Sequence, residues 1–218
     1  MFLMQMLKMG LIGKKKSGAG AGVTYHEADT KTNETPTTSA IFTIEKPENV
    51  SEGDLIVLMV GSRQYAFTPP AGFTLIARYA DNSSTSRAAV QALYKIATNS
   101  EPSTYEGTFA SAVTDWCGVV CRITGHDPEN PIDKHSGDFY AAGTVVVPSL
   151  NASVGNSLMF SLISRYGSGS SDAPSGMTLL HAGARNTFAY ELLEDAGETG
   201  TRTWYSGRSC AAMMFNVK

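Results

Sequence analysis

The chain has 218 residues, of which 17% are charged and 42% hydrophobic, and its formal net charge is −3. It contains 21 Gly and, together, 43 Ser and Thr. The content of aliphatic and aromatic residues excludes wholesale disorder, and the lack of any long Ala/Glu/Lys/Leu-rich run excludes a coiled coil or helical bundle. Low charge with many Gly, Ser, Thr and Val residues is typical of short strands joined by tight turns.

Residues 1–22 form a predicted N-terminal arm with a charge opposite to that of the rest of the chain. They contain four Lys and no acidic residue, whereas the remainder has 13 basic and 20 acidic residues and a net charge of −7. Nine of the first twelve residues are apolar, three lysines follow, and a Gly/Ala-rich stretch ends the segment. Twelve residues are too few to span a bilayer, and a secretory signal carries its positive charge before the apolar run.

We therefore expect an apolar anchor and a basic run that dock on a partner, joined to the body by a flexible tether. A weak signal peptide or a disordered tail is the alternative. The predicted partner-binding residues are Phe2, Leu3, Met6, Leu7, Leu11, Ile12, Lys14, Lys15 and Lys16.

From residue 23 to residue 218, strand signals recur every 8–12 residues or so, which is the spacing of β-sandwiches and barrels. The continuous apolar run at residues 55–60 predicts a strand that is covered on both faces. No segment of this body has convincing helical periodicity, and the predicted class is all-β. The predicted strands are residues 40–44, 55–60, 73–79, 88–96, 105–109, 116–123, 144–147, 158–163, 177–181, 187–193, 201–205 and 210–217.

The body also contains an internal repeat. Residues 53–63 resemble residues 155–165 at an offset of 102, and residues 70–76 resemble residues 174–180 at an offset of 104. Two apolar closing strands lie 93 residues apart. The predicted half-repeats span about residues 40–125 and 143–218. One half cannot easily cover both faces of its apolar strands, so we expect two half-sheets stacked face to face in one jelly-roll-like antiparallel β-sandwich with pseudo-twofold symmetry.

The cysteines Cys117, Cys121 and Cys210 form no C-x-x-C pair, and they are predicted to be reduced core thiols in a protein made in a reducing cytosol. The four histidines lack metal-ligand spacing, so we interpret them as surface or turn residues. Residues 207–211 only partly match a hydrolase nucleophile elbow. The prediction is a non-enzymatic protein with no catalytic residue, metal or cofactor.

Three further groups of residues can be interpreted either as functional or as structural. The acidic and amide side chains Asp127, Asn130 and Asp133 suit either calcium or turn formation, and we favour turns. Acidic residues at 191, 194 and 195 suit either a glycosidase pair or a solvated loop, and we favour the loop. The two tryptophans, Trp116 and Trp204, suit either a sugar platform or core packing, and we favour packing.

The order of several short motifs resembles that of a β-sandwich family of bacteriophage tail, fibre and head-appendage proteins. The family pattern is Gly-Asp before an apolar strand, Pro-x-Gly-Trp-Thr-Leu, an aromatic-Lys strand, Ser-Glu-Pro and Gly-x-Asp-Pro-x-x-Pro-Ile-Asp. The chain has counterparts at residues 53–54, 70–75, 93–98, 100–102 and 125–133, with Phe73 in place of the Trp. The resemblance covers about residues 40–217 and also extends to adhesin-like bacterial proteins.

The resemblance implies a virion structural protein that decorates or cements the particle as a capsid decoration, head appendage or tail component. Its expected partners are other virion proteins and further copies of itself, with a trimer as one option. The acidic body lacks the basic surface that nucleic-acid binding requires, and no membrane is expected as a partner. The competing hypothesis is a carbohydrate-binding or adhesive module, whose candidate glycan-binding residues are Tyr65, Tyr79, Tyr140 and Tyr166.

Overall fold

The computed structural model describes residues 22–35, 39–64, 67–80, 88–113, 115–167, 169 and 172–218. Within these residues the chain forms antiparallel strands and one 3₁₀ turn, η1 (Glu27–Asp29), without an α-helix. The all-β prediction is therefore confirmed. All nine predicted partner-binding residues of the N-terminal arm lie outside the described residues, as does Tyr65.

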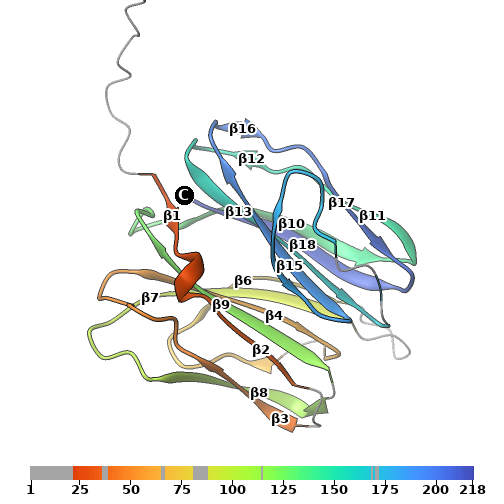
Figure 1. The fold of residues 1–218 in the computed structure, drawn as a ribbon, viewed down its shortest axis with the longest axis horizontal. Helices are drawn as coiled ribbons and strands as arrows, with labels where there is room; N and C mark the ends of the chain where they lie inside the picture. The colour runs from red at the N-terminus through yellow and green to blue at the C-terminus, as the bar shows by residue number, and fades with distance from the viewer. Residues whose placement is uncertain are drawn as a thin grey trace, which may run out of the picture.

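The first half of the body contains one large and one small sheet (Figure 1). The large sheet has the order β1-β9-β4-β7-β6, and β2 also pairs with β9; the small sheet has the order β3-β8-β5. The strands are β1 (Thr24–Tyr25), β2 (Lys31–Thr35), β3 (Ser39–Glu45), β4 (Leu55–Ser62), β5 (Phe67–Thr68), β6 (Thr74–Ala80), β7 (Ala89–Ile96), β8 (Thr104–Val113) and β9 (Trp116–Thr124).

The second half repeats this arrangement. Its large sheet has the order β10-β18-β13-β15-β14, and its small layer consists of the pairs β11-β17 and β12-β16. The strands are β10 (Ile132–Tyr140), β11 (Gly143–Val147), β12 (Asn151–Ala152), β13 (Ser157–Arg165), β14 (Thr178–Ala182), β15 (Asn186–Leu193), β16 (Gly197–Glu198), β17 (Arg202–Ser206) and β18 (Cys210–Val217).

The two large sheets pack face to face, and each small sheet covers the outer face of its own large sheet. A central core joins the halves, and an outer core lies inside each half. Strand β13 crosses β4, while β18 crosses β7 and β15 crosses β9, as a twofold relation between the halves requires. Since both faces are covered, every residue of β4, β13 and β18 is buried. The expected stacking of two half-sheets thus holds, with an outer layer added on each side.

The ladder registers correct the predicted alignment of the halves by one residue. Leu55 pairs with Ile96 and Ile123, and Leu158 pairs with Leu192 and Val217. This correspondence gives an offset of 103 for the central strands and 94 for the closing strands, where the sequence match suggests 102 and 93. A one-residue shift exchanges the two faces of a strand.

The reason for the shift lies at the turn that precedes each central strand. The left-handed position is Gly53 (φ +87°) in the first half and Asn156 (φ +51°) in the second. Among residues other than Gly, Asn is one of those that adopt this conformation most often, so matching glycine with glycine aligns the wrong residues. The next turn keeps the predicted offset of 104, with Gly72 and Gly176 both at positive φ.

The twelve predicted strands all appear, and six further strands were missed. The missed strands include β1, β2 and β10, which extend both large sheets beyond the predicted half-repeats by pairing with β9 or β18. Edge strands of this kind carry polar side chains on both faces and therefore give a weak hydrophobic pattern. No helix of the described residues is long and apolar enough to cross a bilayer.

Candidate functional site

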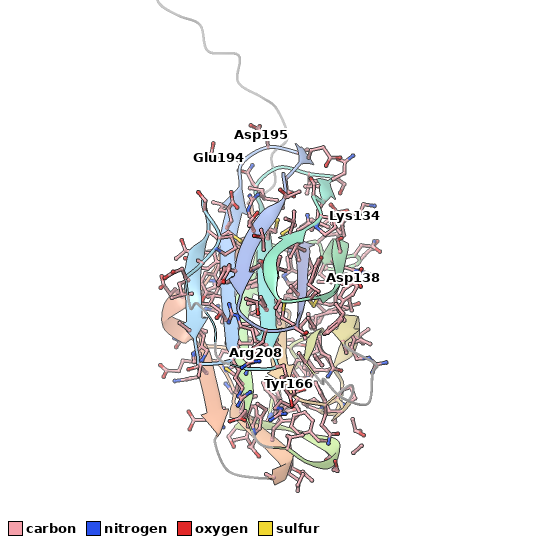
Figure 2. All side chains as sticks on the ribbon, turned by 90° about the vertical axis from the view of Figure 1, so that its right-hand side faces the viewer. Lys134, Asp138, Tyr166, Glu194, Asp195 and Arg208 are labelled. Atoms are coloured by element: carbon pink, nitrogen blue, oxygen red, sulfur yellow. The ribbon has the colours of Figure 1, made fainter. Side chains whose placement is uncertain are left out.

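Four arginines from distant parts of the sequence meet at one end of the body, around Tyr166. Figure 2 shows Tyr166 beside Arg208, while the acidic loop with Glu194 and Asp195 lies at another end. The guanidinium carbon of Arg63 lies 4.9 Å from the centre of the Tyr166 ring. Arg185 donates to the Tyr166 carbonyl and forms a 3.2 Å ion pair with Asp115. Arg208 packs against Gly167 and has its side chain exposed. We call Arg63, Arg165, Arg185 and Arg208 the arginine end.

The fourth member, Arg165, is fully buried at the end of β13. Its Nη1 donates to Thr187 Oγ1 at 2.9 Å, whereas Nε and Nη2 have no hydrogen-bond partner. None of the described acidic side chains forms an ion pair with it. Burial lowers the pKa of Arg165, an effect that the neighbouring Cys210 opposes. Burying a guanidinium without a counter-ion lowers the stability of the fold, and no contact of the described residues compensates for the charge of Arg165.

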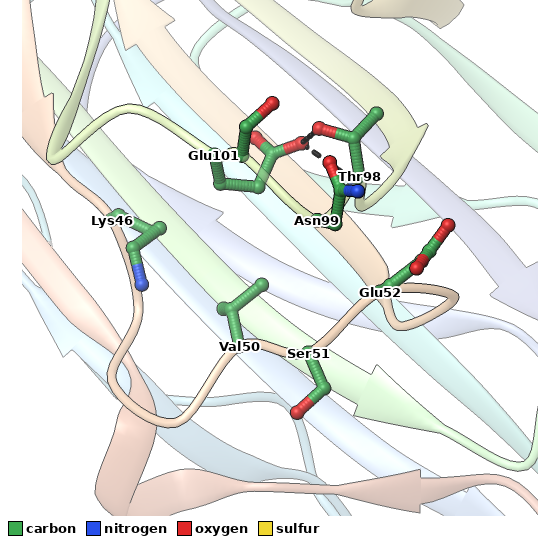
Figure 3. A pocket seen from close by; sticks show the side chains of 8 residues that line it. Lys46, Val50, Ser51, Glu52, Thr98, Asn99 and Glu101 are labelled. Carbon is green, nitrogen blue, oxygen red and sulfur yellow. Dashed lines mark hydrogen bonds between the residues drawn. The ribbon is translucent and has the colours of Figure 1, made fainter.

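A second candidate is the shallow depression where two of the family-like motifs meet (Figure 3). Residues 53–54 hydrogen-bond to Ala97, next to the Ser-Glu-Pro segment at residues 100–102. Glu101 accepts hydrogen bonds from Lys95 (2.8 Å), Tyr105 (3.0 Å) and both the amide and hydroxyl of Thr98 (2.8 and 3.0 Å). These four donors occupy the carboxylate, so Glu101 is held as a structural anchor.

The electrostatics of the depression agree with this role. Burial raises the pKa of Glu101, but the hydrogen bonds from Lys95 and Thr98 outweigh it and hold the pKa below its usual value. Phe73 stands where the family pattern has Trp, and its ring lies 5.1 Å from that of Tyr105 and 5.7 Å from Lys95 Nζ. The Phe73 ring, although smaller than that of Trp, therefore still covers the ion pair between Lys95 and Glu101.

The Asp of the Gly-Asp motif belongs to a second anchoring cluster. Arg122 donates to Asp54 at 2.6 Å and to Asp29 at 2.9 Å. Asn49 donates to Asp29 at 2.8 Å, and the Ser51 amide donates to Asp54 at 2.9 Å. The cluster ties the 3₁₀ turn to β9 and to the turn before β4. Both carboxylates thus accept hydrogen bonds from protein donors, as those of a structural anchor do.

The residues considered for calcium have protein partners as well. Asp127 accepts the amide hydrogens of Glu129 and Asn130 at 2.9 and 3.0 Å, as a turn-forming Asp does. Asp133 accepts from the Ser153 amide at 2.6 Å and from Asn216 at 3.3 Å. Across the described ranges, no three His, Cys, Asp or Glu side chains are grouped so that they could hold a metal ion.

The acidic residues considered for glycoside hydrolysis line one shallow depression after β15, but their contacts differ. Glu191 forms an ion pair of 2.5 Å with Arg202, which also donates from Nε at 3.1 Å. Glu194 and Asp195 are exposed in the loop after β15. The interpretation of a solvated loop fits them better than a catalytic pair does.

The aromatic residues divide into buried and exposed groups. Trp116 and Trp204 are each only 2% exposed, and they lie in the two outer cores, so they cannot form a sugar platform. Trp204 donates to Ser161 at 3.0 Å. Tyr79 and Tyr140 are half-buried, whereas Tyr166 is exposed. Tyr205, 63% exposed on the outer face of β17, was not predicted, because only the strand register shows which face it occupies.

All three cysteines are buried thiols, as predicted. Burial raises the pKa of Cys121 to about 12 and that of Cys210 to about 11. These thiols are therefore protonated near neutral pH and do not act as nucleophiles.

The described chain begins at the junction between the halves. The Val23 amide donates to the Asn156 carbonyl at 3.1 Å, and Val23 belongs to the central core. The Tyr25 ring lies 4.5 Å from that of Tyr190 in the opposite large sheet. The first described residues thus contact both halves of the body.

The arginine end is the feature that the sequence reasoning missed. The body has a net negative charge, so its composition does not indicate a basic cluster. The four arginines lie as far as 145 positions apart in the sequence, so their spacing does not indicate one either. No known protein-family profile matches the chain, and a search of curated proteins finds no matching sequence.

Proposed function

We propose that the chain is a non-enzymatic structural protein of a bacteriophage particle, whose β-sandwich body decorates or cements the surface while the N-terminal arm docks on the capsid or tail scaffold. The observation that carries this proposal is the role of the motif carboxylates. Asp54, Glu101, Asp127 and Asp133 all have protein donors as partners. A scaffold needs residues that stabilise turns and strand ends. Because these carboxylates have that structural role, the proposal assigns binding of the partner to the N-terminal arm.

The partners in this proposal are other virion proteins and further copies of the chain, with a trimer as one option. Full burial of each large apolar arm residue, six of which are predicted to dock, is worth about 1.5–3 kcal/mol. Ordering a flexible arm offsets much of that sum. The lysines of residues 14–16 would contact an acidic scaffold surface.

The test is deletion of residues 1–16, followed by measurement of the copy number on purified particles. Val23 and β1 remain, so the deletion spares every described contact of the body. Copy number should fall by more than about tenfold, since tenfold corresponds to only 1.4 kcal/mol. A body that melts like the full chain confirms folding. Undiminished incorporation would refute docking through the arm.

The second candidate function is adhesion to glycans. The observation that favours it is the exposed Tyr166 ring with Arg63 stacked on it, since exposed aromatic faces stack on sugar rings. A glycan array with the full chain should then give signals that Tyr166→Ala abolishes. The exposed Tyr205 on β17 offers the matched control, because its substitution removes another exposed ring and leaves Tyr166 in place. An array without signal would count against this function.

A further inference from the structure

A shallow depression after β15 contains an exposed leucine at the point where the central core ends. The depression has a volume of about 340 Å³, and Leu192 is among its lining residues. Leu192 lies on the same face of β15 as Phe188 and Tyr190, which belong to or pack against the central core, yet it is 54% exposed. The face that is buried along the rest of β15 is therefore open to a further apolar partner at this end.

The loop that borders this depression carries charge that the repeat does not require. Strands β7 and β15 occupy the same place in the two halves. After β7, residues 97–103 contain one acidic residue, whose carboxylate is held by protein donors. After β15, residues 194–201 contain Glu194, Asp195 and Glu198, and none of the described basic side chains forms an ion pair with these three. The apolar opening is thus flanked by uncompensated negative charge.

The described chain begins directly beside this loop. The Val23 amide donates to the Asn156 carbonyl, and the Asn156 amide donates to the Glu194 carbonyl, both at 3.1 Å. Gly22 lies against the same residue, since a Cβ there would be 2.7 Å from Asn156 Cβ. A single residue therefore bridges the start of the described chain and the acidic loop, which Figure 2 shows at one end of the body.

The sequence before this point has the chemistry that the depression fits. Residues 1–22 contain four Lys and no acidic residue, and Leu11 and Ile12 come shortly before the lysines of residues 14–16. The six residues 17–22 can extend over at most about 20–22 Å, which is ample for a loop that lies beside the exit point. A tether this short gives an effective concentration on the order of millimolar, so even a weak contact would be populated.

We propose that the depression after β15 is a docking site for residues 11–16 of the same chain. The lysines contact the carboxylates of Glu194 and Asp195, and the apolar pair Leu11 and Ile12 packs on Leu192. Docking covers apolar side chains that would promote aggregation if the free chain exposed them. The contact belongs to the free chain before it meets a partner, so it goes beyond the proposed particle role and does not depend on it.

The experiment is limited proteolysis of the full chain with trypsin, which cleaves after Lys and Arg. The rate of cleavage after residues 14–16 is divided by that of a synthetic peptide of residues 9–20 in the same solution. This ratio should be at least about threefold lower at about 20 mM NaCl than at about 500 mM NaCl, because salt screens exposed charges. A threefold decrease corresponds to docking in about two thirds of the molecules.

Two variants test the surface. Leu192→Ser and the double variant Glu194→Gln/Asp195→Asn should each raise the low-salt ratio close to the high-salt value. The matched controls are Leu75→Ser, which removes a leucine that is 43% exposed on β6, and Glu52→Gln, which removes an exposed carboxylate beside the depression after β7. Both controls should behave like the wild type. All of these side chains are exposed, and an unchanged Tm confirms folding.

The wild-type comparison does not depend on how the variants fold. The proposal is overturned if the low-salt ratio of the wild type equals its high-salt ratio, or if either surface variant is cleaved as slowly as the wild type. Protection that increases with the concentration of the chain would assign the surface to a second copy and would also overturn docking within one chain. Each of these results leaves the copy-number test of the particle role unaffected.

Discussion

Gly61→Ala is the sharpest probe of how the two large sheets pack. Gly61 lies on β4 and faces Asn186 of the opposite sheet; a Cβ at this position would lie 2.2 Å from Asn186 Oδ1, 2.7 Å from Cγ and 3.2 Å from Cβ. Rotating the terminal amide moves Oδ1 but leaves Cγ too close. Either the Asn186 side chain changes its rotamer or the sheets move apart.

The cost follows from overpacking a buried interface, which is typically about 1–3 kcal/mol. For a chain of this size, each kcal/mol lowers the Tm by about 2–4 °C, so a decrease of about 2–12 °C is expected. Asn186→Ala removes Cγ and Oδ1, and Oδ1 has no hydrogen-bond partner. The double variant Gly61→Ala/Asn186→Ala should therefore regain most of the loss.

Urea unfolding of the wild type, both single variants and the double variant gives the coupling energy, which we expect to be about 1–2 kcal/mol. Gly207→Ala is the matched control, because a Cβ at Gly207 would meet nothing within 4 Å. A neutral Gly61→Ala, or a loss that persists when Asn186 is Ala, would refute the contact between β4 and β15 and with it the observed register of the halves.

Three further predictions concern acid stability, thiol reactivity and an outer core. The pKa of Asp29 lies below its ordinary value of 3.8, first because Asn49 donates a hydrogen bond to it and then because of Arg122. Its contribution to stability is thus present above pH 3.8 and is lost as the pH falls through the folded pKa; urea unfolding between about pH 5 and pH 2 should show a shallower loss in Asp29→Asn, and an unchanged slope would contradict this role. A colorimetric thiol reagent at about pH 8 should find no reactive cysteine in the native chain and all three in denaturant, because all three thiols are buried away from the reagent; rapid native labelling would show that the cores open. Trp204→Phe should lower the free energy of unfolding by about 1–3 kcal/mol, since it leaves the buried Ser161 hydroxyl without its 3.0 Å donor; a neutral result in chemical denaturation would mean that Ser161 finds another partner.

The hydrophobic pattern predicted the twelve strands that supply most of the core residues. Runs such as residues 55–60 are apolar at every position because both faces of the strand are covered, and this is a local property of the sequence. The cysteines were predicted to be buried thiols for the same reason. The turn at residues 69–72 was also predicted from its Pro and Gly residues, and Gly72 adopts the positive φ that the turn requires.

The outer layers were not predictable in the same way. The pair β12-β16 has a very short sequence, and β10, at the edge of a large sheet, is polar; the pairing of both depends on neighbours that are distant along the chain. The predicted sandwich has two layers, whereas the structure has four, because each large sheet is covered by a small one. The predicted alignment of the two half-repeats was wrong by one residue, because Asn156 takes the left-handed conformation that Gly53 has in the first half.

The sequence by itself determined that this chain is all-β, that it repeats itself and that its charge divides between basic residues 1–22 and an acidic remainder. Those properties depend on composition and on short-range periodicity. Only the tertiary structure decided that Trp116 and Trp204 are buried and that Arg165 is held without a counter-ion beside three further arginines. Such a cluster forms only when strand ends from both halves come together in the folded chain. Short-range sequence patterns therefore do not predict it.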